Sequence, residues 1–376
     1  MTNHDYKQNA YYLMYLIRCV LNNKIPAKEK IDKINLSDLL TVAKEHSLSA
    51  IAAYALESAG IYDKDFEEEK FKAIRKNIIL DTEREAVLAE LEKAGIWYMP
   101  LKGSILKDLY PQTGMRQMCD VDILFDNNFT DDMLRIMDDL GYQKKKESFG
   151  HDIEFSKEPV SCFEMHIQLF GFSNMDNMNQ YYSDVKSILH KDENNDFGYH
   201  FSLEDFYIFL IAHSYKHFSG GGNGLRSLTD TYVYLTHYRN ELDMKYIQQE
   251  CEKLDIAEFE KQNRELALLL LGGKKLSQDE SKLFDYYIFS GTYGNITNHV
   301  KNKLESDKTS AKIKYLFRRL LIPVSKKNSS YHAFANRYKW FYENRIRLPL
   351  LVPYRLGLAL TKRRARMVAE LKALKK

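Results

Sequence analysis

The sequence predicts an α+β protein in which a small mixed sheet is flanked by an N-terminal and a C-terminal helical domain. Apolar residues recur every three or four positions before residue 95 and again after residue 203, which is the spacing of amphipathic helices. Between these segments lie short apolar runs bounded by turn residues, which are typical of strands. The expected domains are residues 1–95 (helical), 96–200 (α/β core), 201–322 (helical) and 323–376 (basic tail helices).

The first domain is expected to be helical throughout. Leu13, Leu16 and Ile17 share one helix face. A later helix is predicted for about residues 66–93, because Gly95 is a residue type that commonly follows a helix end. The pattern leaves open whether this domain faces a substrate or is the packing partner of the sheet.

The core begins with a strand, a tight turn and a short helix. The apolar run 96–99 leads through Pro100 and Leu101 into Lys102, Gly103 and Ser104. Glycine lets the backbone approach a ligand closely, and the free N–H groups at a helix start suit phosphate. A Gly-Ser pair is also common in ordinary turns, and Lys102 either contacts a phosphate or lies exposed beside the turn.

A second strand follows, in which Asp120 and Asp122 precede the apolar residues 123–125. Because side chains alternate along a strand, both carboxylates lie on one face and Val121 lies on the other. Two carboxylates this close repel each other unless a cation lies between them, and Mg2+ is the natural candidate beside a phosphate site. Alone, such a pair of acids is also common on solvated strand edges.

Three further elements complete the predicted core. We expect a helix over 130–140, a strand up to residue 147, and two more strands over 150–155 and 161–169. The last of these strands carries Glu164 and His166 on one face.

Residues 101–125, LKGSILKDLYPQTGMRQMCDVDILF, resemble the nucleotidyltransferases of the polymerase-β-like superfamily, and look closest to a poorly characterised bacterial nucleotidyltransferase family within it. Members of that family carry LKG, Tyr-Pro, an Arg and Asp-x-Asp in this order. The resemblance extends best over residues 95–240. It implies that Gly103 and Ser104 hold the β and γ phosphates of an NTP, and that Asp120 and Asp122 bind Mg2+.

The same resemblance implies a third metal carboxylate on a later strand, which we assign to Glu164, with a role in orienting or deprotonating the attacking hydroxyl. His166 and His151 are then candidates for the acceptor side of the cleft. An acid-x-His pair is also a common surface pattern. Arg116 lies in a gap that is longer than in the commoner superfamily pattern; it suits a phosphate, or it pairs with Asp120 or Asp122.

Helix is predicted again from Leu203. His213, Lys216 and His217 are three and four residues apart and therefore share one helix face. The two histidines are candidates for the acceptor side, and Lys216 could neutralise a nucleotide phosphate.

The glycine-rich loop 219–224 that follows is expected to be flexible and could move over the phosphates. On the next predicted helix, Arg226 is a second candidate phosphate ligand. It also suits an intrahelical ion pair with Asp230, worth at most about 0.5 kcal/mol.

The last segment is basic. Between Arg355 and Lys376 there are eight Lys or Arg residues against one acid, Glu370, with apolar side chains among them. This pattern suits weak contact with an anionic membrane surface, or a solvated helix packed on the core.

Composition argues against several classes of protein. The net charge of +3 gives no strong nucleic-acid signal. The four cysteines have no CxxC spacing, which argues against a zinc site or disulfide scaffold and fits a cytoplasmic protein. We find no secretory signal and no apolar run long enough to span a membrane.

The residues and the resemblance together predict a Mg2+-dependent nucleotidyltransferase that moves an NMP from an NTP to an unknown hydroxyl acceptor. A small molecule, sugar or protein is expected as acceptor rather than RNA. The alternatives are a catalytically silent relative that binds nucleotide, and a membrane-surface accessory protein.

Overall fold

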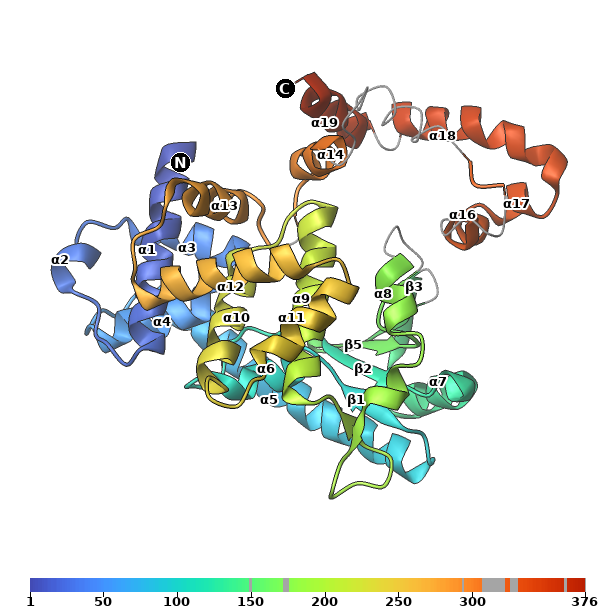
Figure 1. The fold of residues 1–376 in the computed structure, drawn as a ribbon, viewed down its shortest axis with the longest axis horizontal. Coiled ribbons are helices and arrows are strands. Elements are labelled where there is room, and N and C mark those ends of the chain that lie inside the picture. Colours follow the sequence, from blue (N-terminus) through green and yellow to red (C-terminus); the bar gives the residue numbers. More distant parts are fainter. Residues whose placement is uncertain are drawn as a thin grey trace.

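The computed structural model describes the chain apart from residues 149–150, 172–175, 293, 306–321, 325–330, 362–363 and 376. Helices surround one five-stranded sheet (Figure 1), so the predicted α+β class is confirmed. The strands of this sheet are β1 (Tyr98–Pro100), β2 (Val121–Phe125), β3 (Gln143–Ser148), β4 (Asp152–Lys157) and β5 (Ser161–His166).

The helices fall before, between and after the strands. Before the sheet come α1 (Asn3–Leu21), α2 (Lys28–Ile31), α3 (Leu36–Glu45), α4 (Ser49–Ser58) and α5 (Lys64–Lys93). Between the strands are α6 (Gly103–Leu106), η1 (Lys107–Leu109), η2 (Asn127–Phe129) and α7 (Thr130–Asp139). After it come α8 (Asp176–Tyr181), η3 (Val185–Ile188), the small hairpin β6 (His190–Lys191) and β7 (Tyr199–His200), α9 (Leu203–Gly220), α10 (Leu225–His237), α11 (Met244–Lys253), α12 (Ala257–Gly272), α13 (Gln278–Ile288) and α14 (Ile296–Glu305). The C-terminal elements are α16 (Tyr331–Arg337), α17 (Lys339–Tyr342), η4 (Arg345–Leu350), α18 (Leu351–Leu360) and α19 (Arg364–Lys375).

The long helix α5 has clear start and stop signals. The Asp63 carboxylate accepts hydrogen bonds from the backbone N–H groups of Asp65 and Phe66, which have no partner within the helix. At the other end Gly95 has φ of +69°, a conformation that glycine adopts without strain and that ends the helix before β1. The predicted limits of this helix are confirmed to within two residues.

The sheet is mixed, with strand order β1-β2-β5-β4-β3. β2 runs parallel to β5, and the other neighbouring pairs are antiparallel. In the parallel pair Asp122 lies in register with Glu164, and Leu124 with His166. β5 ends at His166, three residues earlier than predicted, because the N–H groups of Ile167 and Gln168 both turn to the carbonyl of His151.

The two faces of the sheet have different partners. Val121, Ile123 and Phe125 pack with α5 and α7 in one hydrophobic core. The opposite face, which carries Asp122 and Leu124, is turned toward α9 and α10. The alternation predicted for β2 is therefore confirmed, and it separates an apolar face from a face that bears carboxylates.

The N-terminal helices share a hydrophobic core with helices that follow the sheet. Buried apolar residues of α1, α3 and α4 pack together with those of α10, α12 and α13 in one cluster. The N-terminal helices thus support the helical wall that faces the sheet. No helix in the part of the chain that the structure describes is long and apolar enough to cross a membrane.

Candidate active site

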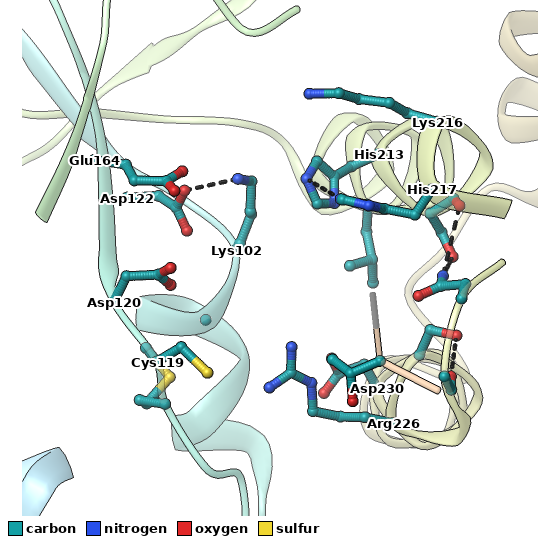
Figure 2. Close-up of a pocket in the computed structure, with 18 of the residues that line it drawn as sticks. Lys102, Cys119, Asp120, Asp122, Glu164, His213, Lys216, His217, Arg226 and Asp230 are labelled. Atoms are coloured by element: carbon teal, nitrogen blue, oxygen red, sulfur yellow. Dashed lines mark hydrogen bonds and ion pairs between the residues drawn. The ribbon is translucent and has the colours of Figure 1, made fainter. Parts of the chain in front are cut away.

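A cavity of about 320 Å³ lies between the carboxylate face of the sheet and the helices α9 and α10 (Figure 2). Twelve of the thirteen residues predicted from the sequence line it. They are Lys102, Gly103, Arg116, Asp120, Asp122, His151, Glu164, His166, His213, Lys216, His217 and Arg226. Ser104 does not line the cavity, and its buried hydroxyl has no hydrogen-bond partner among the described residues. Segments more than 120 positions apart are thereby brought to one place.

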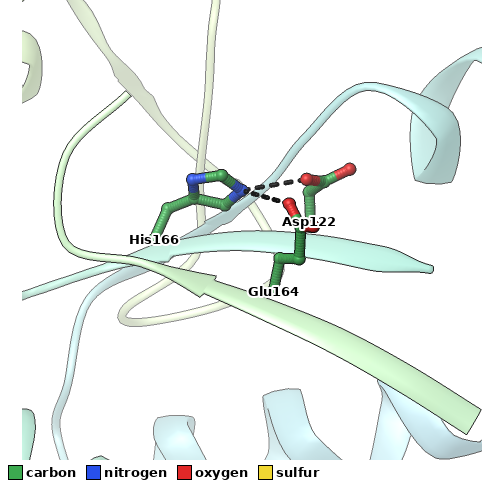
Figure 3. Close-up of side chains that lie close together, drawn as sticks. All are labelled: Asp122, Glu164 and His166. Atoms are coloured by element: carbon green, nitrogen blue, oxygen red, sulfur yellow. Dashed lines mark hydrogen bonds and ion pairs between the residues drawn. The ribbon is translucent and has the colours of Figure 1, made fainter. Parts of the chain in front are cut away.

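The centre of the acidic side is formed by Asp122, Glu164 and His166, whose ligand atoms all lie within 4.8 Å of one another (Figure 3). Nε2 of His166 is 2.9 Å from Oδ1 of Asp122 and 3.6 Å from Oε2 of Glu164. The register of β2 and β5 explains the proximity, since it places Glu164 directly beside Asp122. His166 was predicted for the acceptor side, and the structure places it in contact with the acids.

Two further carboxylates adjoin this group. Asp120 lies on the same face of β2 and lines the cavity. Asp152 of β4 pairs in register with His166, and its side chain is almost fully buried. Sequence analysis missed Asp152. The available signal was its alternation with the apolar residues Ile153 and Phe155, which places it on the same side of the strand as other acids.

The crowded acids shift one another's pKa values. Burial would raise the pKa of Asp122, but the Lys102 ammonium and the hydrogen bond with His166 outweigh it and hold this pKa well below its usual range. For Glu164, burial and next the negative charge of Asp122 raise the pKa to about 8. Burial and Asp122 also raise the pKa of Asp120. Asp122 is therefore the permanent anion, and Glu164 holds a proton at neutral pH until a cation offsets the repulsion.

Lys102 faces the acids from the turn between β1 and α6. Its Nζ lies 2.6 Å from Oδ1 of Asp122, and its φ of +45° is unusual for a residue with a side chain. The turn is held to β2 by a hydrogen bond from the N–H of Leu101 to the carbonyl of Asp122. Lys102 is thus partly buried and paired rather than exposed beside the turn.

The reason for glycine at position 103 differs from the predicted one. A Cβ there would lie 2.5 Å from Nη1 of Arg116 and 2.7 Å from Cε of Met118. The protein's own side chains fill the space that sequence analysis had reserved for a close ligand. Gly103 is therefore required for packing between the turn and the segment before β2.

Arg116 makes a buried ion pair that the sequence did not predict. Its Nε and Nη2 donate to the two carboxylate oxygens of Asp230 at 2.9 and 3.0 Å, and the hydroxyl of Tyr110 donates to the same carboxylate at 2.7 Å. The predicted partners Asp120 and Asp122 are not its partners. The intrahelical alternative for Arg226 is also wrong, because Asp230 is taken by Arg116 and the Nη1 of Arg226 donates to the carbonyl of Gln117.

The helical wall opposite the acids carries nitrogen groups. His213, Lys216 and His217 share one face of α9, as predicted, and Arg226 extends from α10 (Figure 2). The Nε2 atoms of His213 and His217 are 3.2 Å apart. Burial lowers the pKa of His217 to about 4 and that of His213 well below its usual value, so both imidazoles are neutral. Burial and the nearby Lys102 lower the pKa of Lys216.

The glycine-rich loop beside this wall, which was expected to be flexible, is packed against residues 290–292 and 294–295. The N–H of Asn295 donates to the carbonyl of Gly221, and that of Gly222 to His217. A Cβ on Gly222 would lie 2.2 Å from Oγ of Ser290. Movement of this loop over the cavity would have to break these contacts.

The donor set fits a divalent cation. Asp120, Asp122 and Glu164 offer the hard carboxylate oxygens that Mg2+ and Mn2+ prefer. The ligand atoms of Asp122, Glu164 and His166 lie within 4.8 Å of one another, and burial and next the charge of Asp122 raise the pKa of Glu164, so a cation here would stabilise the ionised acids. His166 can hold Asp122 in position through Nε2, since orienting hydrogen bonds behind a carboxylate ligand are common at metal sites.

Carboxylates facing Lys and Arg side chains across a cavity suit metal-assisted chemistry on a phosphate-bearing substrate. Residues 32–272 match the family described as "Uncharacterised nucleotidyltransferase", and the chain belongs to this family. The crystal structure of an antigenic nucleotidyltransferase-like protein from Paracoccidioides brasiliensis is also similar, with 16% identity and a TM-score of 0.34 over 54% of this chain and 95% of that chain. No curated protein matches the sequence. Family membership supports nucleotidyl transfer as the general activity.

Proposed function

We propose that the protein is a Mg2+-dependent nucleotidyltransferase of the polymerase-β-like type, which moves an NMP from an NTP to a hydroxyl acceptor. The observation that carries this proposal is the register of β2 and β5. It sets Asp122 beside Glu164, with Asp120 on the same face, opposite a wall that contains Lys216 and Arg226.

Each side of the cavity has a distinct role in this proposal. Asp120, Asp122 and Glu164 hold the cation, which when bound neutralises charge that develops on the phosphate oxygens. Lys102 and Arg226 are the cations best placed for the triphosphate, because the positive charges of both act on Asp120 and Lys102 pairs directly with Asp122. Lys216 extends the same positive wall, whereas Arg116 acts indirectly by anchoring β2 to α10 through Asp230.

The acceptor hydroxyl oxygen forms a bond to the α-phosphorus, and the bond from this phosphorus to the bridging oxygen of pyrophosphate breaks. Glu164, once ionised, takes the proton of the hydroxyl, and pyrophosphate leaves with the bridging electron pair.

The acceptor is proposed to be a small molecule, a sugar or a protein rather than RNA. The first 344 residues carry a net charge of −6, since ten Lys or Arg and one acid lie in the last 32 and the whole chain carries +3. Proteins that track a nucleic-acid backbone usually present a basic stripe. The imidazoles of His151, His213 and His217, which line the cavity, are candidates for binding the acceptor. The four cysteines, which lie far apart with no CxxC spacing, fit a cytoplasmic location.

The test is release of pyrophosphate from each of the four NTPs with Mg2+, using cell extract as the source of acceptor. Wild type is compared with Asp120→Ala/Asp122→Ala and with a matched double variant, Asp138→Ala/Asp139→Ala, which alters two exposed acids of α7. We expect the first variant to lose release by at least 100-fold and the second to retain it.

An α-phosphate label on the NTP then identifies the acceptor in the same extract. Binding of nucleotide and metal by wild type, without release above the Asp120→Ala/Asp122→Ala background in any extract, would support the alternative of a catalytically silent nucleotide-binding protein.

A further inference from the structure

The C-terminal elements α16, α17, η4 and α18 form an arm, residues 331–361, that extends away from the body of the molecule (Figure 1). Within the described residues this arm is connected to the body through α19, which packs on α18 and on α14, and α14 in turn packs on α9. The arm therefore offers a surface that the proposed catalytic cavity does not use.

Large apolar side chains on and beside the arm are exposed. Ile346 is 84% exposed, Leu360 62%, and Leu350 and Trp340 each 55%. Exposed apolar residues of the arm and its neighbours are Val324, Trp340, Ile346, Leu350, Tyr354, Leu356, Leu360 and Val368. Leu350 and Tyr354 lie on a different side of the helix from Leu356 and Leu360, so that more than one side of η4 and α18 is apolar. Contiguous apolar exposure of this kind marks an interaction surface.

Positive charge is interleaved with these apolar groups. In residues 346–360 the charged residues are Arg347 and Arg355. The Arg347 guanidinium lies 4.5 Å from the ring centre of Trp340, and that of Arg355 lies 4.9 Å from the ring centre of Phe334. Cationic and aromatic groups therefore lie in contact at two places along the arm.

The charge of the chain is strongly divided. Residues 345–376 contain ten Lys or Arg and one acid, a net charge of +9, whereas residues 1–344 carry −6. An anionic surface would attract the last 32 residues and repel the acidic body. Such a division orients a molecule, with residues 345–376, which include the end of the arm and the segment after it, toward the surface and the body away from it.

We propose that the C-terminal arm docks on an anionic lipid bilayer, with Trp340, Leu350 and Leu360 among the side chains inserted at the headgroup level and the arginines on lipid phosphates. The ten-residue helix α18 is too short to cross a bilayer, which requires about 20 apolar residues. A helix of this length can instead lie along the headgroup region, where its exposed leucines are removed from water and Arg355 reaches lipid phosphate. A nucleic acid would satisfy the charge but would leave the exposed leucines and Ile346 in water. The bilayer satisfies both.

The experiment is co-sedimentation of the full chain with vesicles of phosphatidylcholine alone or with 30% phosphatidylglycerol. We expect at least tenfold stronger binding to the anionic vesicles at low salt, and a large loss of binding at 0.5 M salt. Ile346→Ser/Leu350→Ser/Leu360→Ser should lose binding by at least tenfold. The matched variant Ile25→Ser/Phe71→Ser/Ile78→Ser changes body residues of similar exposure and should bind as wild type does.

A spectroscopic readout follows insertion directly. The chain has two tryptophans, and Trp97→Phe leaves Trp340 as the reporter. Its emission should shift to shorter wavelength with anionic vesicles and remain unchanged with phosphatidylcholine alone. Equal sedimentation of wild type and the Ile346/Leu350/Leu360 variant would overturn the proposal. So would a concentration-dependent dimer, abolished in that variant and seen without vesicle binding, since the arm would then bind a second copy of the chain.

Discussion

Nζ of Lys102 lies 2.6 Å from Oδ1 of Asp122, the same oxygen that Nε2 of His166 approaches at 2.9 Å. An ammonium group thus occupies the immediate surroundings of the atom that the proposed cation would bind. The pKa of Lys102 is raised because Asp122 outweighs the effect of burial, so the ammonium is fully charged. Lys102 acts as a counter-ion to the acids when no metal is bound.

Replacement of this counter-ion should have opposite effects on metal and nucleotide. Lys102→Met removes a cation that competes for Asp122, so Mn2+ should bind at least tenfold more tightly without nucleotide, a change of about 1.4 kcal/mol. NTP affinity should fall by a similar factor, because the triphosphate loses a positive partner. Mn2+ binding is measured by electron paramagnetic resonance and NTP binding by calorimetry. Lys93→Met, at an exposed site, is the matched control. Unchanged or weaker Mn2+ binding in Lys102→Met would contradict this role.

The Arg116–Asp230 pair should contribute to stability rather than to chemistry. Arg116→Met leaves the Asp230 carboxylate buried with Tyr110 as its remaining donor, and removal of one partner from such a pair costs about 3–5 kcal/mol. Urea unfolding at pH 7 measures the loss. Arg135→Met breaks an exposed pair with Asp132 on α7 and should cost less than about 1 kcal/mol.

A double variant separates the pair from its surroundings. Arg116→Met/Asp230→Leu leaves no buried charge at this place, and it should be more stable than Arg116→Met alone. An additive loss in the double variant would show that each side chain stabilises the fold through other contacts.

The features of the site that follow from local periodicity could be predicted from the sequence. Alternation along one strand suffices to place Asp120 and Asp122 on one face, and Glu164 with His166 on another strand. The order of the strands in the sheet could not be predicted from local periodicity. Asp122 lies beside Glu164 because β5 pairs with both β2 and β4, and this pairing depends on how the chain folds back through β3 and β4.

Features that depend on contacts far along the chain were missed or assigned wrongly. Arg116 and Asp230 are 114 positions apart, whereas Asp120 and Asp122 are close to Arg116 in the sequence and were therefore expected as its partners. Loop 219–224 has a flexible composition, but Gly221, Gly222 and Gly224 leave no room for a Cβ because another loop packs against them. The packing role of Gly103 could not be predicted either, because the side chains of Arg116 and Met118 fill the space beside it only in the folded structure.

Gly222 offers a direct test of that loop packing. Gly222→Ala places a Cβ 2.2 Å from Oγ of Ser290, at a φ of +127° that side chains rarely adopt. The strain should destabilise the protein by about 1–3 kcal/mol in urea unfolding. Gly220→Ala is the control, because nothing lies within 4 Å of its Cβ and alanine favours the end of α9 where it lies; it should be neutral or slightly stabilising. Equal stability of the two variants would show that the loop moves freely.

His46 should make the fold sensitive to acid. Its side chain is fully buried. The Nδ1 atom of His46 accepts a hydrogen bond from the N–H of Leu225, so the proton of the neutral ring is carried by Nε2. Burial lowers its pKa to about 4, from an ordinary value of about 6.5 in the unfolded chain. The unfolded state therefore binds a proton first as the pH falls below 6.5.

Because the unfolded state binds the proton first, the free energy of unfolding falls as the pH falls. The stabilisation is fully present above pH 6.5 and is lost progressively between pH 6.5 and 4, by about 2 kcal/mol at pH 5. His46→Asn keeps an acceptor for Leu225 but cannot titrate. The free energy of unfolding is measured for wild type and His46→Asn from pH 7 to pH 5, and the advantage of wild type should shrink by about 2 kcal/mol over that range. His4→Asn, at an exposed position of α1, should differ from wild type by a constant amount. A constant difference for His46→Asn as well would show that His46 does not control the acid sensitivity.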